Sequence, residues 1–120
     1  MVIGGISIKG RSHEKNQDSF ICEQVKDSYL IAVSDGLGSK ILSEEGSAAL
    51  TFAARAVFIG REGLVLDAND LKQFVAEVHS RRLTSLEVQN FPVEDCCCTC
   101  LIFLLLPEKI FAARLGDGFI

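Results

Sequence analysis

The spacing of apolar residues changes twice along this chain of 120 residues, and no other feature constrains its fold as much. The first part has the period of two that is typical of strands, the middle has a helical period, and the last part returns to strands. This order predicts an α+β fold with two antiparallel β layers and with both helices packed together on one face. The predicted strands cover residues 2–9, 19–25, 29–34, 98–106 and 109–115.

The first predicted helix covers residues 43–59. Ser43 is a candidate N-cap, and Glu44 and Glu45 in the first turn suit the helix dipole. Gly60 is a natural place for the helix to stop.

The second predicted helix begins near Asp67 or Asn69 and runs to Glu87. Arg81 and Arg82 are expected in its more polar half. Its apolar stripe, which faces the core, consists of Leu71, Phe74, Val75 and Val78.

Composition excludes several classes of protein. A hydrophobic content of 48% argues against disorder, and a chain of this length is at most one domain, residues 1–120. The net charge is −4 with no run of Lys or Arg, which argues against nucleic-acid and anionic-membrane partners. The most apolar run, residues 96–106, is too short to span a bilayer, and the N-terminus does not resemble a signal peptide. We therefore expect a cytoplasmic protein.

Five cysteines raise the question of a metal or disulfide framework. Cys22 stands alone, and the others crowd into "DCCCTC" as Cys96, Cys97, Cys98 and Cys100. Cys97 and Cys100 have the CxxC spacing, but no nearby pair of histidines accompanies them to complete a zinc site. We expect reduced cysteines that behave as small buried hydrophobes.

Three aspartates stand at predicted strand ends or beside glycine: Asp18 in "KNQDSF", Asp35 in "VSDGLGS" and Asp117 in "LGDGF". Each alone is weak evidence, since Asp-Gly is a common turn pair. Asp35 and Gly36 together are more informative, because a hard cation binds a carboxylate and an unshielded carbonyl at the same point.

Four motifs, in order, resemble those of the metal-dependent 2C-type (PPM) protein serine/threonine phosphatases. "GRSHEKNQDSF" resembles the first motif of the family, and "IAVSDGLGSKILSEEGS" resembles its Asp-Gly loop that leads into a helix. "CCCTCLIFLL" lies where the family has a strand of small residues and Thr, and "IFAARLGDGFI" resembles its later Gly-Asp strand end. The resemblance covers almost the whole chain but only the N-terminal part of the family's domain, in a divergent branch.

The resemblance implies a β-sandwich of antiparallel sheets flanked by helices, here a partial domain. It also implies a centre of two Mg²⁺ or Mn²⁺ ions that activates water to hydrolyse phosphomonoesters on a phosphoprotein. Asp35 would bridge the ions, and the Gly36 carbonyl would bind one of them. Asp18 would hold metal-bound water or bind a further, weak ion, and Asp117 is a candidate for that accessory site. Arg11, or His13 beside it, would bind the substrate phosphate.

The chain departs from the family pattern at two positions: Gln17 replaces a common Glu, and Leu37 replaces a frequent His. The family's later metal aspartates are not in this sequence, so we expect the isolated chain to be inactive. The alternative function is a non-catalytic pseudophosphatase or regulatory binding fragment. An unrelated cytosolic α/β domain with ordinary turn aspartates is a third interpretation. We also expect a homodimer, because a partial domain leaves sheet edge and core surface uncovered.

Overall fold

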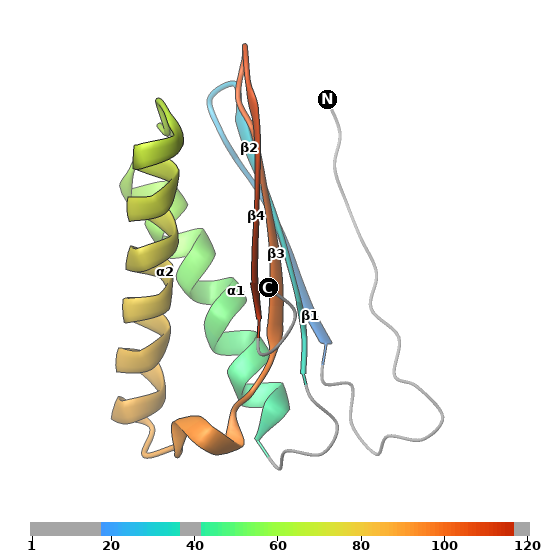
Figure 1. Ribbon diagram of the computed structural model, residues 1–120, viewed down its shortest axis with the longest axis vertical. Helices are drawn as coiled ribbons and strands as arrows, with labels where there is room; N and C mark the ends of the chain where they lie inside the picture. Colours follow the sequence, from blue (N-terminus) through green and yellow to red (C-terminus); the bar gives the residue numbers. More distant parts are fainter. Residues whose placement is uncertain (1–17, 37–41, 117–120) are drawn as a thin grey trace.

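The computed structural model describes residues 18–36 and 42–116. They form a four-stranded antiparallel sheet with two helices on one of its faces (Figure 1). The predicted α+β class and the antiparallel pairing are therefore confirmed. The strand predicted at residues 2–9 lies outside the described residues.

The sheet consists of two hairpins joined side by side, in the order β1-β2-β3-β4. In each hairpin two strands follow each other closely in the sequence, and β2 and β3 pair in the middle, where Leu30 is opposite Leu104. The strands are β1 (Asp18–Val25), β2 (Ser28–Asp35), β3 (Thr99–Leu105) and β4 (Ile110–Gly116).

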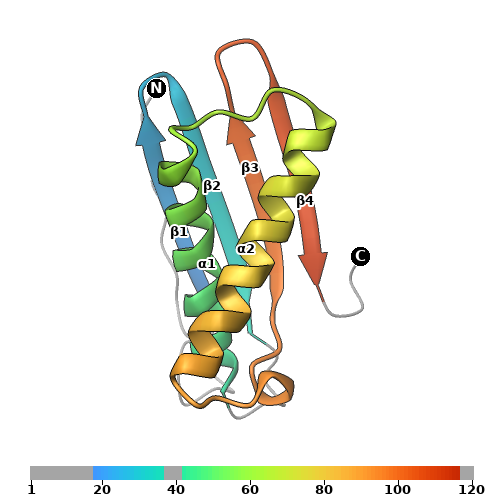
Figure 2. The ribbon, with the colours of Figure 1, turned by 90° about the vertical axis from the view of Figure 1, so that its left-hand side faces the viewer.

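Helices α1 (Ser43–Gly60) and α2 (Ala68–Val88) connect the two hairpins. α1 packs on β1 and β2, and α2 packs on α1 and on β4, so the pair crosses the same face of the sheet (Figure 2). A short 3-10 turn, η1 (Val93–Asp95), leads from α2 into β3. No helix among the described residues has the length and apolar character needed to cross a bilayer.

The hydrophobic core lies between the sheet and the helices. Alternate residues of the two central strands point into it, which is why their sequences show a period of two. The core combines strand residues Leu30, Ala32, Ile102 and Leu104 with helix residues that include Phe58 and Phe74, all essentially inaccessible to solvent. Burying apolar side chains of this size stabilises the fold by roughly 1.5–3 kcal/mol each.

The other face of the sheet, which we call the outer face, is also apolar. Val33, Leu101 and Phe103 lie on it and are 41%, 40% and 37% exposed. No second sheet covers this face within residues 18–36 and 42–116. This part of the chain therefore forms one layer of the predicted two.

Two details of the helices differ from the sequence-based predictions. The N-cap of α1 is Leu42 and makes no side-chain cap, whereas Ser43 is the first helical residue and is fully buried. Arg82, expected on the polar side of α2, is buried with only 8% of its surface exposed. The stripe of α2 continues through position 82 to the buried Leu86, so an arginine occupies an apolar position.

Candidate metal site at one end of the sheet

The candidate site lies where β2 ends, opposite to the hairpin turns. Asp35 is the last residue of β2, and the alternation of the strand places it on the outer face, where it is exposed. Gly36 follows directly, is buried, and forms an isolated antiparallel bridge with Cys98. A buried strand thus ends in a carboxylate that is followed at once by a glycine backbone.

The β1–β2 register brings a second acidic residue to the same point. Asp18 is the direct Cα partner of Asp35, although the two are separated by a whole hairpin. The backbone pairing thus brings two aspartates, a residue type whose carboxylate oxygens hard cations prefer, to one end of the sheet. Oxygen-rich, acidic surroundings of this kind suit hard divalent cations such as Mg²⁺ and Mn²⁺, so these residues fit the metal that the motifs imply.

Thr99 holds the backbone of Asp35 from the other side. Its hydroxyl accepts a hydrogen bond from the Asp35 amide at 3.3 Å and donates one to the Asp35 carbonyl at 3.4 Å. The Ser34 hydroxyl donates to the Thr99 carbonyl at 2.7 Å. Thr99 belongs to the motif "CCCTCLIFLL", but its role cannot be predicted from the sequence because its partner is remote along the chain.

The end of β4 lies next to Thr99 and completes a row of strand ends across this end of the sheet. Gly116, the residue before Asp117, is the Cα partner of Thr99. The backbones of Asp18, Asp35, Thr99 and Gly116 therefore lie next to one another across one end of the sheet.

Other predicted site residues cannot be placed in this row. Arg11, His13 and Asp117 lie outside the described residues, as do the two departures from the family pattern, Gln17 and Leu37. Within residues 18–36 and 42–116 no three His, Cys, Asp or Glu side chains gather in a way that could hold a metal ion. The described residues by themselves therefore offer too few ligands for a metal centre.

The cysteines next to this site are poorly suited to nucleophilic chemistry. All five are free. Burial, together with the neighbouring Cys98, raises the pKa of Cys100 to about 12, although Arg82 opposes the shift. Burial also raises the pKa of Cys96, against the opposing effect of the Arg82 guanidinium. A thiol that keeps its proton at neutral pH is a weak nucleophile and a weak metal ligand.

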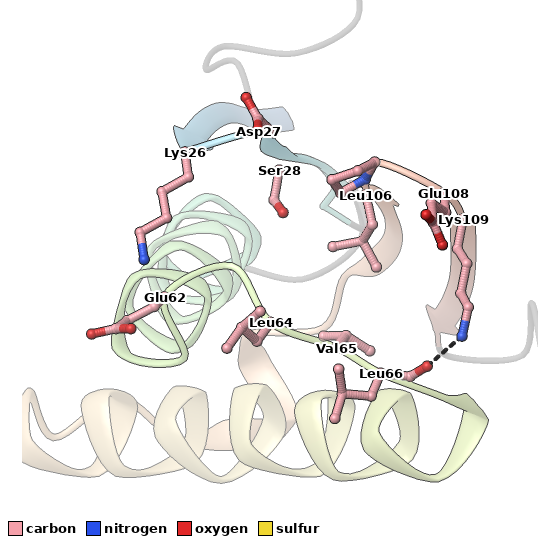
Figure 3. A pocket seen from close by; sticks show the side chains of 11 residues that line it. Lys26, Asp27, Ser28, Glu62, Leu64, Val65, Leu66, Leu106, Glu108 and Lys109 are labelled. Carbon is pink, nitrogen blue, oxygen red and sulfur yellow. Dashed lines mark hydrogen bonds between the residues drawn. The ribbon is translucent and has the colours of Figure 1, made fainter.

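A cavity of about 430 Å³ opens at the opposite end of the sheet, near the two hairpin turns (Figure 3). Val65 and Leu106 form part of its apolar wall, and Lys26 and Glu108 belong to its charged lining. The Lys109 ammonium donates a hydrogen bond to the Leu66 carbonyl at 2.7 Å. Asp18, Asp35 and Gly36, the predicted site residues that the structure describes, do not line this cavity, which is therefore distinct from the candidate metal site.

A family model described as "Protein phosphatase 2C" matches residues 9–120, a stretch that contains every predicted site residue from Arg11 to Asp117. No curated protein and no solved structure matches the chain.

Proposed function

The chain belongs to the protein phosphatase 2C family, and on that premise we propose that it contributes to a metal-dependent phosphatase of phosphoserine and phosphothreonine in proteins. The observation that carries the proposal is the register that opposes Asp18 to Asp35, with Gly36 as the next residue. The family generally uses Mg²⁺ or Mn²⁺, and the acidic strand end is consistent with such an ion.

In this proposal each residue of the strand end has a defined task. The Asp35 carboxylate binds metal from an exposed position on the outer face, and the Gly36 carbonyl is available because glycine has no side chain to shield it. Asp18, on the neighbouring strand, is proposed to hold metal-bound water or to bind a further, weak ion, and Asp117 is proposed for that accessory site. Arg11 or His13 is proposed to bind the substrate phosphate through a charge-assisted hydrogen bond. When bound, a pair of divalent ions supplies Lewis acidity that activates water for attack on phosphorus.

The test of the metal site compares two aspartates of the same hairpin. Asp35→Ala and Asp35→Asn are expected to abolish Mn²⁺ binding in calorimetry. Asp27→Ala is the matched control, because Asp27 is an exposed aspartate in the turn at the other end of the β1–β2 hairpin. We expect weak binding by the unaltered chain, since hard cations prefer about six oxygen ligands. Equal Mn²⁺ affinity in the Asp35→Ala variant and the unaltered chain would show that Asp35 is only a strand-end residue.

The test of activity uses p-nitrophenyl phosphate and a phosphothreonine peptide. The isolated 120-residue chain is expected to show little or no turnover, because its ligand set is too small for a two-metal centre. A longer polypeptide with further acidic ligands should be active with Mn²⁺ and should lose activity on Asp35→Ala. Rapid turnover by the purified 120-residue chain would contradict the need for further ligands.

A pseudophosphatase is the second candidate function, and two residues favour it. Gln17 removes a charge that the family pattern has before Asp18, and Leu37 removes a frequent histidine after the Asp-Gly pair. Under this alternative the longer polypeptide binds a phosphopeptide but does not hydrolyse it at saturating Mn²⁺. Hydrolysis there would exclude the alternative.

A further inference from the structure

Arg82 is a buried cation without an ion-pair partner among the described residues. It lies on the stripe of α2 between Val78 and Leu86, which are both completely buried. An apolar residue at this position would fill the space without the free-energy penalty of removing a charge from water. The choice of arginine therefore requires an explanation in what its guanidinium contacts.

The guanidinium contacts two backbone carbonyls from different parts of the chain. Its Nε donates to the carbonyl of Gly46 in the first turn of α1 at 3.4 Å, and a terminal nitrogen donates to the carbonyl of Cys96. Gly46 also packs directly on Cys96: a Cβ at position 46 would lie 2.1 Å from the Cys96 oxygen. We call Arg82, Gly46 and Cys96 the Arg82 clasp.

Cys96 of the clasp belongs to a short stretch, residues 95–99, that contacts the chain on both sides of the candidate metal site. On one side, Leu42, just before α1, donates its amide to the Asp95 carbonyl at 2.9 Å. On the other side, Cys98 bridges Gly36, and the Thr99 hydroxyl bonds to the Asp35 backbone. The end of β2 and the beginning of α1 are thus attached to the same few residues, and Arg82 ties those residues to α2.

We infer that Arg82 is a positioning residue for the candidate metal site, because it sets the place of residues 95–99 and thereby of the Asp35–Gly36 backbone. The expected effect of Arg82 on Mn²⁺ affinity rests on the proposed function, whereas its expected effect on amide hydrogen exchange does not. Arg82 itself is remote from the metal ligands in sequence and acts through Cys96, Cys98 and Thr99. Its planar fork of donors suits two carbonyls at once, which a lysine ammonium on a flexible stem does less well.

The first experiment measures amide hydrogen exchange in the metal-free chain. Arg82→Met keeps an unbranched apolar side chain in the stripe but removes both hydrogen bonds. Exchange at the Leu42 amide, which donates to Asp95, and at the Asp35 amide, which donates to Thr99, should accelerate by about tenfold or more. Arg81→Met is the matched control, since Arg81 is the exposed neighbour on the same helix, and it should leave both amides unchanged.

The second experiment measures Mn²⁺ affinity by calorimetry. Loss of a partner that orients metal ligands typically weakens metal binding by roughly 10–100-fold, and we expect the lower end of that range for Arg82→Met. Arg82→Lys should recover part of the loss because its ammonium reaches one carbonyl. Arg81→Met should bind Mn²⁺ like the unaltered chain.

The outcomes separate this inference from the proposed function. If the unaltered chain binds no Mn²⁺, the proposed function fails, and the exchange experiment alone decides the role of Arg82. If Arg82→Met does not fold, Arg82→Lys is measured in its place, with the same acceleration expected in smaller degree. A folded Arg82 variant with unchanged exchange at Leu42 and Asp35 overturns the inference, and so does unchanged Mn²⁺ affinity in a chain that binds the ion.

Discussion

At the scale of single residues, the two glycines of α1 have opposite surroundings. Gly46 faces the backbone of Cys96 so closely that no Cβ fits, whereas a Cβ at Gly60 would meet nothing within 4 Å. The first glycine allows α1 to approach the stretch before β3, and the second occupies the last helical position without any such contact. Close packing therefore requires glycine at position 46, near the start of α1, but not at position 60, at its end.

Gly46→Ala and Gly60→Ala should accordingly change stability in opposite directions. We expect Gly46→Ala to lower the free energy of unfolding by about 1–3 kcal/mol or more, since the added methyl group must displace backbone. Gly60→Ala should be neutral or raise it by up to about 1 kcal/mol, because alanine favours the helix. Urea denaturation measures both. Equal effects of the two substitutions would contradict the close approach of α1 to Cys96.

Cys100 predicts a dependence of stability on alkaline pH. Its pKa rises from 9.0 to about 12 on folding, chiefly because the thiol is buried. Below pH 9 both the folded and the unfolded chain keep the proton, so Cys100 adds no pH dependence there. Between pH 9 and 12 only the unfolded chain releases it, and the free energy of unfolding falls by up to about 1.4 kcal/mol per pH unit.

Urea denaturation under reducing conditions at several alkaline pH values tests this dependence. Cys100→Ala should lower stability below pH 9, through the lost packing, and should remove this part of the slope between pH 9 and 12. Cys22→Ala, on the outer face, serves as the control for loss of a thiol. Identical slopes with and without Cys100 would show that burial does not hold its proton.

Some residues of the candidate site can be identified from the local sequence, and others cannot. Asp35 and Gly36 could be identified because an apolar run ends abruptly on them, which is a local signal. The roles of Thr99 and Arg82 depend on partners that are remote in the sequence, and nothing nearby reveals them. Arg82 did carry one local signal, its position on the apolar stripe four residues after Val78.

At the scale of elements, the strands and helices predicted within the described residues match the observed ones closely. The first helix was predicted at residues 43–59 and is observed at Ser43–Gly60, because apolar periodicity over several turns is a strong signal. The start of that helix was wrong in its chemistry, since Leu42 and not Ser43 occupies the cap position. The amide of Gly46 makes the first helical hydrogen bond, to the Leu42 carbonyl, and the amide of Leu42 donates to the Asp95 carbonyl, so a tertiary contact fixes the residue just before the helix.

The start of α2, in contrast, has a side-chain cap and supports a prediction. The Asp67 carboxylate accepts a hydrogen bond from the Asp70 amide at 2.8 Å, and the Asp70 carboxylate accepts one from the Leu66 amide at 2.9 Å. Asp67→Ala should lower the free energy of unfolding by about 1 kcal/mol, and Asp67→Ser should restore most of it. Asn69→Ala, at an exposed position in the same turn, is the control and should have a smaller effect. A loss on Asn69→Ala as large as that on Asp67→Ala would argue against the cap.

At the scale of the whole molecule, the described residues have one covered and one bare face of the sheet. The helices cover the core face, while Val33, Leu101 and Phe103 remain partly exposed on the outer face. The sequence of β3 already indicated a strand covered on both sides, because it is apolar at nearly every position. What covers the second side could not be read from the strand itself, since an apolar face is compatible with many apolar partners.

We expect the 120-residue polypeptide to self-associate through this bare face. Sedimentation velocity should show dimers or larger species that increase with concentration, since apolar surface of this extent favours association. Phe103→Lys should shift the population toward monomer. Phe52→Lys is the matched control, because Phe52 is 64% exposed but lies on α1 and not on the outer face. A monomer of 13.1 kDa at all concentrations would contradict the expectation.

The central pairing of β2 with β3 has a consequence for the order in which the molecule assembles. Each hairpin pairs strands that are neighbours in the sequence and can close within roughly 1–10 μs. The pairing of Tyr29 with Leu105, in contrast, closes a loop that contains both helices. Contacts between residues so distant in sequence form late, because a long loop loses entropy when it closes. The two helices lie between these strands in the sequence and pack on each other, so their docking shortens the effective loop before the strands meet. We therefore expect the chain to fold as two complementary halves, hairpin with helix and helix with hairpin, whose joining is the slow step of folding.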